Sequence, residues 1–191
     1  MGDPWDDVFE LMWAAYAAGT IPVGAVVVDE SGSIVARGRN RILDEPGARG
    51  LGRSRLAHAE INALAALESS RRYEDHMLLS ALEPCHLCLS AAIAVRVGRV
   101  RYAASDPYAG STGLLLPSAD HLAHPVEVEG PLDGPRGRLP ELLHVAHFLW
   151  RVPDGGVATF YRERSPDLLE AARALPAPDS GATLADAFAA L

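Results

Sequence analysis

The sequence contains no lysine, so all 17 of its basic residues are arginine, against 25 aspartates and glutamates. With a formal net charge of −8, the chain is a poor candidate for binding nucleic acid through a broad positive surface, although a local basic patch stays possible. Long hydrophobic runs are also missing, and none approaches the roughly 20 residues of a membrane-spanning helix. We therefore expect no membrane partner.

Cysteine is scarce, since only Cys85 and Cys88 occur. The N-terminal stretch MGDPWDDVFE is acidic and has neither the basic start nor the apolar segment of a signal peptide. We therefore expect a cytoplasmic protein. In a reducing compartment a pair of cysteines three positions apart is more often a metal or redox site than a structural disulfide.

The remaining composition, 49% hydrophobic and 22% charged over 191 residues, is typical of a globular protein with one core and an appendage. Hydrophobic periodicity and β-branched runs predict the following elements. Helices are expected at 4–18, from 58 onward, at 84–97, at 139–151 and at 165–175. Strands are expected at 21–29, 34–38, 76–82, 99–105 and 125–130. Residues 40–55 read as a long loop, and the alternation of strands with helices implies an α/β architecture.

Two short motifs carry the chemistry: HAE at 58–60 and PCHLC at 84–88. Together they match the HxE and PCxxC signature of zinc-dependent deaminases. The thiolates of Cys85 and Cys88 and the imidazole of His58 make three zinc ligands and leave the fourth tetrahedral position for water. Glu60 is then a carboxylate that can accept a proton from that water and pass it to the departing amino group. We thus predict a Zn²⁺ cofactor and a catalytic Glu60.

The spacing has a physical reason. Residues three apart lie on the same side of one helical turn, so both sulfurs can face one ion. A helix start after Pro84 would bring the positive end of the helix dipole to the thiolates and favour their ionised form. His58 would come from a second helix start. His58 and Glu60 are two positions apart, so they do not share a face of a regular helix. They need not do so, because one binds the metal and the other transfers protons.

Two other interpretations stay open at this point. A CxxC pair is also found in dithiol redox proteins. A structural zinc site would need a fourth protein ligand, and six further histidines are candidates for it: His76, His86, His121, His124, His144 and His147.

From about Trp5 to Gly130 the chain resembles the cytidine and deoxycytidylate deaminase superfamily, within it the branch of tRNA adenosine deaminases and guanine deaminases. The stretches that carry the resemblance are IPVGAVVV, GRNR, AHAEINAL, LEPCHLC, GRVRYAASD and YAGSTG. The resemblance implies a three-layer α/β/α cytidine deaminase-like fold with a mixed five-stranded sheet, zinc at the starts of two helices, and a homodimer. It also implies a deaminase domain at residues 1–150 and a C-terminal helical extension at 151–191.

The resemblance further implies four substrate-binding residues. Asn40 matches an asparagine that hydrogen-bonds the base or ribose, and Val23 would line the pocket. The backbone around Ala59 and Cys85 would border the water. Asp106 matches a common family residue, although a turn or cap before Pro107 explains it as well. The chain departs from this branch in three places. The stretch SRLAHAE lacks the proline and threonine that usually stand just before HAE, and the loop that precedes it is longer. Beyond Gly130 the match fades.

The substrate follows less directly. We expect a free nucleobase, nucleoside or related amino-heterocycle, with tRNA adenosine as the alternative, because binding a phosphate backbone draws on basic contacts that an acidic chain has in short supply. Six arginines that precede the HAE motif nevertheless form a local basic cluster that could hold phosphate: Arg37, Arg39, Arg41, Arg49, Arg53 and Arg55.

Overall fold

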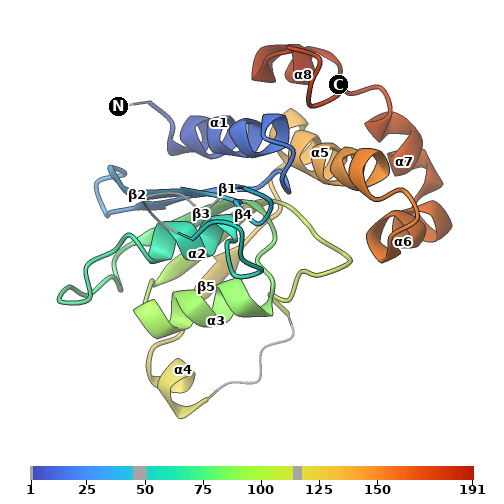
Figure 1. The fold of residues 1–191 in the computed structure, drawn as a ribbon. Helices are drawn as coiled ribbons and strands as arrows, with labels where there is room; N and C mark the ends of the chain where they lie inside the picture. The colour runs from blue at the N-terminus through green and yellow to red at the C-terminus, as the bar shows by residue number, and fades with distance from the viewer. Residues whose placement is uncertain (1, 45–50, 114–117) are drawn as a thin grey trace.

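The computed structural model describes residues 2–44, 51–113 and 118–191. Within these ranges a mixed five-stranded sheet lies between two layers of helices (Figure 1). The strands are β1 (Gly24–Val28), β2 (Ile34–Arg39), β3 (Met77–Leu82), β4 (Arg99–Ala104) and β5 (Glu127–Glu129). Their order is β2-β1-β3-β4-β5, with β1 antiparallel to β2 and β3, and β4 parallel to β3 and β5. The three-layer α/β/α arrangement with a mixed five-stranded sheet, which was expected from the sequence, is confirmed.

Helices cover both faces of this sheet (Figure 1). They are α1 (Pro4–Ala17), α2 (Ala59–Leu64), α3 (His86–Val95), α4 (Ala119–Ala123), α5 (Pro135–Arg151), α6 (Gly156–Arg164), α7 (Pro166–Ala172) and α8 (Leu184–Ala189). Helices α1 and α5 lie on one face, α2 and α3 on the other, and α6, α7 and α8 gather beside α5 and α1. In the part of the chain that is described, no helix combines the length and apolarity needed to cross a membrane.

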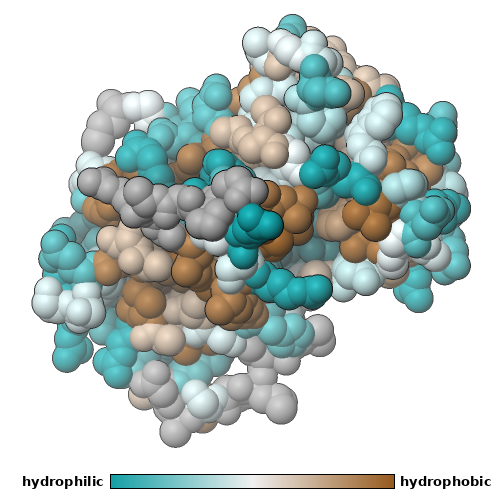
Figure 2. Space-filling model, in the orientation of Figure 1, coloured by the Kyte–Doolittle hydropathy of each residue, from teal (hydrophilic) through white to brown (hydrophobic). Residues whose placement is uncertain are grey.

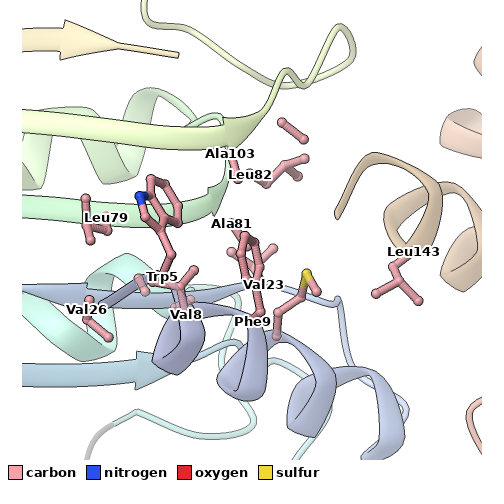
Figure 3. Packing of buried hydrophobic residues seen from close by; sticks show 14 of the residues in the cluster. Trp5, Val8, Phe9, Val23, Val26, Leu79, Ala81, Leu82, Ala103 and Leu143 are labelled. Atoms are coloured by element: carbon pink, nitrogen blue, oxygen red, sulfur yellow. The ribbon is translucent and has the colours of Figure 1, made fainter. Parts of the chain in front are cut away.

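The core lies on both faces of the sheet, and α1 supplies several of its large side chains. Asp3 caps α1 by accepting a hydrogen bond from the Trp5 amide, and Pro4 supplies the first helical residue. Trp5, Val8 and Phe9 then face the sheet, as Figure 3 shows. Every residue of β1 is buried, which explains its uninterrupted apolar sequence: a strand covered on both faces needs no polar alternation.

A glycine in β2 sets how closely α2 approaches the sheet. A Cβ at Gly38 would lie 2.2 Å from the Ala59 carbonyl oxygen and 2.4 Å from the Ala63 amide nitrogen. Both contacts are with helix backbone, which cannot rotate away. The absent side chain of Gly38 therefore allows the first turn of α2, with the HAE motif, to rest directly on the strand.

The structure differs from the sequence-based elements mainly at helix ends and near the C-terminus. Helix α2 ends at Leu64, and α5 begins at Pro135, before the expected start at residue 139. Helices α4, α6 and α8 were not individually expected. The C-terminal tail packs on α1, where the Phe188 ring lies 5.9 Å from the Phe9 ring. Of the expected loop 40–55, residues 45–50 lie outside the described part of the chain.

Candidate metal centre and active site

The two motifs meet because each begins a helix. His58 is the N-cap of α2 and Cys85 is the N-cap of α3, both with extended backbone angles. An N-cap side chain commonly accepts a hydrogen bond from its own helix, but neither of these does. Their side chains face one another instead, and Cys88 joins them from the first turn of α3. The structure thus brings together the three residues predicted to bind zinc.

The distances between the three ligand atoms fit a tetrahedral ion. The His58 Nδ1 lies 3.7 Å from the Cys85 Sγ and 3.4 Å from the Cys88 Sγ, and the two sulfurs are 3.6 Å apart. Zinc bonds of about 2.3 Å to sulfur and 2.0 Å to nitrogen, at tetrahedral angles, imply separations of about 3.5–3.8 Å. Two soft thiolates and an imidazole are also ligands that zinc favours. The donor set therefore suits a zinc ion in both geometry and chemistry.

Each of these three groups shifts the pKa of its neighbours. The contact with the Cys88 Sγ, together with the contact with the His58 imidazole, lowers the pKa of Cys85 to about 3. The same contact with Cys85, together with burial, raises the pKa of the Cys88 thiol. The contact with Cys85 raises the pKa of His58. Without a cation the group therefore favours one thiolate.

Glu60 lies beside this group in the first turn of α2 and is only 4% exposed. Its Oε1 accepts a 3.0 Å hydrogen bond from the Ser80 hydroxyl of β3. Its Oε2 lies 3.3 Å from the Cys88 Sγ. Burial raises the pKa of the Glu60 carboxyl. A fixed carboxylate thus stands next to the three ligand atoms without belonging to their group.

A cavity of about 170 Å³ opens beside His58, Glu60 and Cys85. Three of the four residues that the resemblance implies for substrate binding line it: Val23, Asn40 and Asp106. The fourth, Ala59, is the first residue of α2, fully buried between His58 and Glu60, and is not part of the described lining.

Asn40 is held in a fixed orientation at the cavity wall. Its Oδ1 accepts hydrogen bonds from the Thr20 hydroxyl at 2.7 Å and from the Ile42 amide at 3.1 Å. The side chain is 2% exposed. Because both contacts use the oxygen, the amide nitrogen Nδ2 is the group that Asn40 can offer to a ligand.

Asp106 has a structural task as well. Its Oδ1 accepts hydrogen bonds from the amides of Tyr108 and Ala109, which is the turn interpretation of this residue. Sequence reasoning missed its partner Glu83. One Glu83 oxygen accepts from the Asp106 amide, and the other accepts from the Thr112 hydroxyl at 2.6 Å. Glu83, which directly precedes Pro84, thereby joins the loop after β4 to the start of the PCHLC motif.

Sequence reasoning also missed the wall that α5 and α6 contribute. His144 and Phe148 of α5 and Val157 of α6 line the cavity. Helix α6 further supports the loop after β4, since the Tyr108 and Phe160 rings meet edge to face at 5.5 Å. No motif marks these residues, because their only signal is the position at which two distant helices dock.

Three of the six arginines in the cluster pair with acidic neighbours. Arg39 and Arg41 both pair with Asp44, at 2.5 Å and 3.1 Å. Arg37 pairs with Asp7. Arg49 lies outside the described residues.

A family comparison agrees with this site. Residues 6–104 match the family model described as the cytidine and deoxycytidylate deaminase zinc-binding region. The matched range contains the three ligand residues and Glu60. The chain therefore belongs to the cytidine and deoxycytidylate deaminase family, and His58, Cys85 and Cys88 form the group that can hold the zinc cofactor of the matched region.

Curated relatives match about half of the chain. The chain is 35% identical over 109 residues to the tRNA-specific adenosine deaminase of Haemophilus influenzae. This match covers 54% of this chain and 58% of that protein. The chain is also 40% identical over 96 residues to the tRNA(Ile)-lysidine synthase of Deinococcus radiodurans, covering 49% of this chain and 15% of that protein. The chain thus spans only part of the length of these relatives.

Solved structures extend the likeness to two thirds of the chain. One, from a study of A-to-I editing by tRNA:A34 deaminases at the wobble position, has a TM-score of 0.52 at 26% identity and covers 67% of this chain and 91% of that one. Another, a mutant protein in complex with 8-azaguanine, has a TM-score of 0.51 at 27% identity and covers 65% and 73%.

Proposed function

We propose that this chain is a hydrolytic deaminase that acts on a free nucleobase, a nucleoside or a related amino-heterocycle. The observation that carries the proposal is the cavity beside Glu60. Its volume of about 170 Å³ is below the roughly 300–1,000 Å³ of sites for drug-sized ligands. Phe148 and Val157 border it with apolar surface. A site of this size suits one flat heterocycle.

The residues around the cavity have distinct tasks in the proposed reaction. A bound zinc ion supplies Lewis-acid activation of a water molecule. Glu60 accepts a proton from the attacking water and delivers it to the departing amino group, so that a carbon–nitrogen bond is replaced by a carbonyl and ammonia leaves. The Ser80 hydroxyl holds Oε1 of Glu60 by a hydrogen bond, and Oε2 lies beside the Cys88 Sγ of the three zinc-binding residues. Asn40 orients the base with Nδ2, while Val23 and Phe148 exclude water from its faces.

Two ligands seen in similar structures support a purine-like substrate. The 8-azaguanine complex has a TM-score of 0.51. A second complex, with 2,6-diaminopurine, has a TM-score of 0.50 at 27% identity. Both ligands are bicyclic heterocycles with an exocyclic amino group. Hydrolytic deamination cleaves the carbon–nitrogen bond that joins such a group to the ring.

The alternative substrate is an adenosine in tRNA. The names of the Haemophilus influenzae and tRNA:A34 relatives favour it. The pairing of Arg37, Arg39 and Arg41 with aspartates disfavours it, because a phosphate ligand would have to compete with carboxylates already in place. Two more remote alternatives, a dithiol redox protein and a structural zinc protein, predict no ammonia release at all.

We further propose a cytoplasmic homodimer, with residues 1–150 as the deaminase domain and 151–191 as its extension. Hydrophobic side chains gather on the face formed by α2 and α3 (Figure 2). Leu56, before α2, is 53% exposed, and Leu87, in α3, is 37% exposed. A dimer through this face would cover them. Sedimentation of the wild type and of Leu87→Glu tests this: the dimer predicts a smaller particle for the variant.

The substrate is tested by ammonia release from the zinc-loaded protein across a panel of free bases, nucleosides, nucleotides and an adenosine-bearing anticodon stem-loop. Glu60→Gln serves as the blank for each compound. Release from a free base or nucleoside that is lost in the blank supports the proposal. Release from the stem-loop alone would establish the tRNA alternative and overturn the small-molecule substrate.

A further inference from the structure

A histidine of α5 lies in the cavity wall without a hydrogen-bond partner. His144 lines the cavity, and its side chain is only 5% exposed. Among the described residues, neither Nδ1 nor Nε2 of its ring has a partner. Edge-to-face contacts with Phe148 at 5.1 Å and Tyr161 at 6.2 Å hold the ring between aromatic neighbours. Buried polar groups are nearly always hydrogen-bonded, so this ring is equipped for a contact that a ligand would supply.

The second histidine of the same helix shows what distinguishes His144. His147 is also buried, at 2% exposed, and its Nδ1 has no partner among the described residues. It does not line the cavity. Both residues could be buried in the core for packing alone, but only His144 combines an unpartnered ring with a place in the wall of the site.

The protonation of His144 fits a neutral ligand. Burial lowers the pKa of its imidazole, while Asp106, which lines the same cavity, acts in the opposite direction. A neutral imidazole offers one donor and one acceptor. Such a pair suits the ring nitrogens and carbonyl oxygens on the edge of a heterocycle.

The position of His144 indicates which edge it would meet. Helix α5 lies on the face of the sheet opposite to α2 and α3, which carry the ligand group and Glu60 (Figure 1). His144 therefore approaches the cavity from the other layer. A heterocycle whose amino group points at Glu60 would present its remaining edge toward α5.

We propose that His144 is a specificity-determining residue, whose imidazole hydrogen-bonds a ring nitrogen or carbonyl oxygen on the edge of the heterocycle away from the reacting amino group. This rests on the proposed small-molecule substrate. It assigns recognition of the base to α5, which lies beyond the matched family region at residues 6–104.

The test compares His144→Phe, which removes both ring nitrogens, with the matched control His147→Phe. Dissociation constants for the panel of bases and nucleosides are measured by calorimetry on zinc-loaded protein that also carries Glu60→Gln, so that bound ligand is not consumed. We expect His144→Phe to weaken binding of the best ligand about 10- to 100-fold. We expect His147→Phe to change it less than twofold. Equal constants for the parent and His144→Phe, or equal losses in the two variants, would overturn the proposal.

Ligand analogues supply a second arm that needs no apolar variant. A set of analogues is used in which each ring nitrogen in turn is replaced by CH. We expect one of these replacements to weaken binding to the protein that retains His144. His144→Gln, which retains a donor and an acceptor, should show a smaller loss than His144→Phe for the parent ligand. If no CH replacement affects binding, and the carbonyl-free analogues bind equally well, His144 does not recognise the base.

These measurements separate the proposal from the proposed function. If the wild type releases no ammonia from any compound, the small-molecule deaminase fails, yet the dissociation constants still decide the role of His144. If turnover occurs and His144→Phe binds its substrate normally, only the role of His144 fails. Absence of binding by any heterocycle would overturn both.

Discussion

The Ser80 hydroxyl donates a 3.0 Å hydrogen bond to Oε1 of Glu60, and both side chains are buried. This contact joins β3 to the first turn of α2 and fixes the carboxylate beside the ligand group. We predict that Ser80→Ala lowers kcat several-fold with little change in KM, since Glu60 then loses its orientation but the cavity wall is unchanged. Steady-state kinetics measures this, with the exposed Ser90→Ala of α3 as the control. A change in KM alone would contradict the positioning role.

Zinc binding should depend on the N-cap histidine of α2 and not on the histidine between the cysteines. We predict that His58→Ala purifies with little zinc, because the remaining two thiolates form an incomplete site. His86→Ala, an exposed neighbour of Cys85, should keep one zinc per chain. Metal analysis of the two variants checks this. Equal zinc in both would show that His58 is not a ligand.

Chelation should lower the thermal stability of the wild type. The ligand group joins the starts of two helices, so an ion bound to the native state stabilises it by mass action. The melting temperature of His58→Ala should be the same with and without chelator. A wild-type melting temperature that chelator leaves unchanged would contradict the metal centre.

Stability should fall in mildly acidic solution because of His147. Burial, with smaller effects of His144 and Arg151, lowers the pKa of His147 to about 4 from its ordinary 6.5. As pH falls below 6.5 the unfolded chain binds a proton that the native state excludes until about pH 4, so native stability is lost within this range. The shift corresponds to on the order of 3 kcal/mol. Urea unfolding should show a shallower loss between pH 7 and pH 4.5 for His147→Phe than for the wild type; parallel curves would contradict this.

The close approach of α2 to β2 should make Gly38 intolerant of a side chain. We predict that Gly38→Ala destabilises the fold by about 1–3 kcal/mol, because its Cβ would overlap the backbone of α2. Gly2→Ala, where nothing lies within 4 Å of the added carbon, is the control. Denaturant unfolding compares the two. Equal stability of both variants would show that α2 can shift at no cost.

The sequence predicted the chemistry better than the wall around it. His58, Glu60, Cys85 and Cys88 could be found because their spacing has a local reason: each motif begins a helix, and each helix start brings its residues to one point. The apolar run of β1 was similarly readable. These features depend on interactions close in the chain.

The missing parts depend on distant contacts or on weak local signals. Helix α6 begins with two glycine positions and contains β-branched and aromatic residues, which are indifferent helix formers. Pro140 lies inside α5, so a start near residue 139 fitted the usual place of proline, whereas Pro135 begins the helix. Glu83 and His144 carry no motif, since their tasks arise only when the loop after β4 and α5 dock beside the metal centre.

The most direct test of the account is ammonia release by the zinc-loaded wild type and by Glu60→Gln at equal zinc content, on the best compound of the panel. The exposed Glu68→Gln, just after α2, is the matched control. We predict that Glu60→Gln lowers the rate by about 10²- to 10⁴-fold while keeping its zinc, as expected for loss of a general acid–base. We predict that Glu68→Gln leaves the rate unchanged. A Glu60→Gln protein that holds zinc and releases ammonia at the wild-type rate would contradict the account.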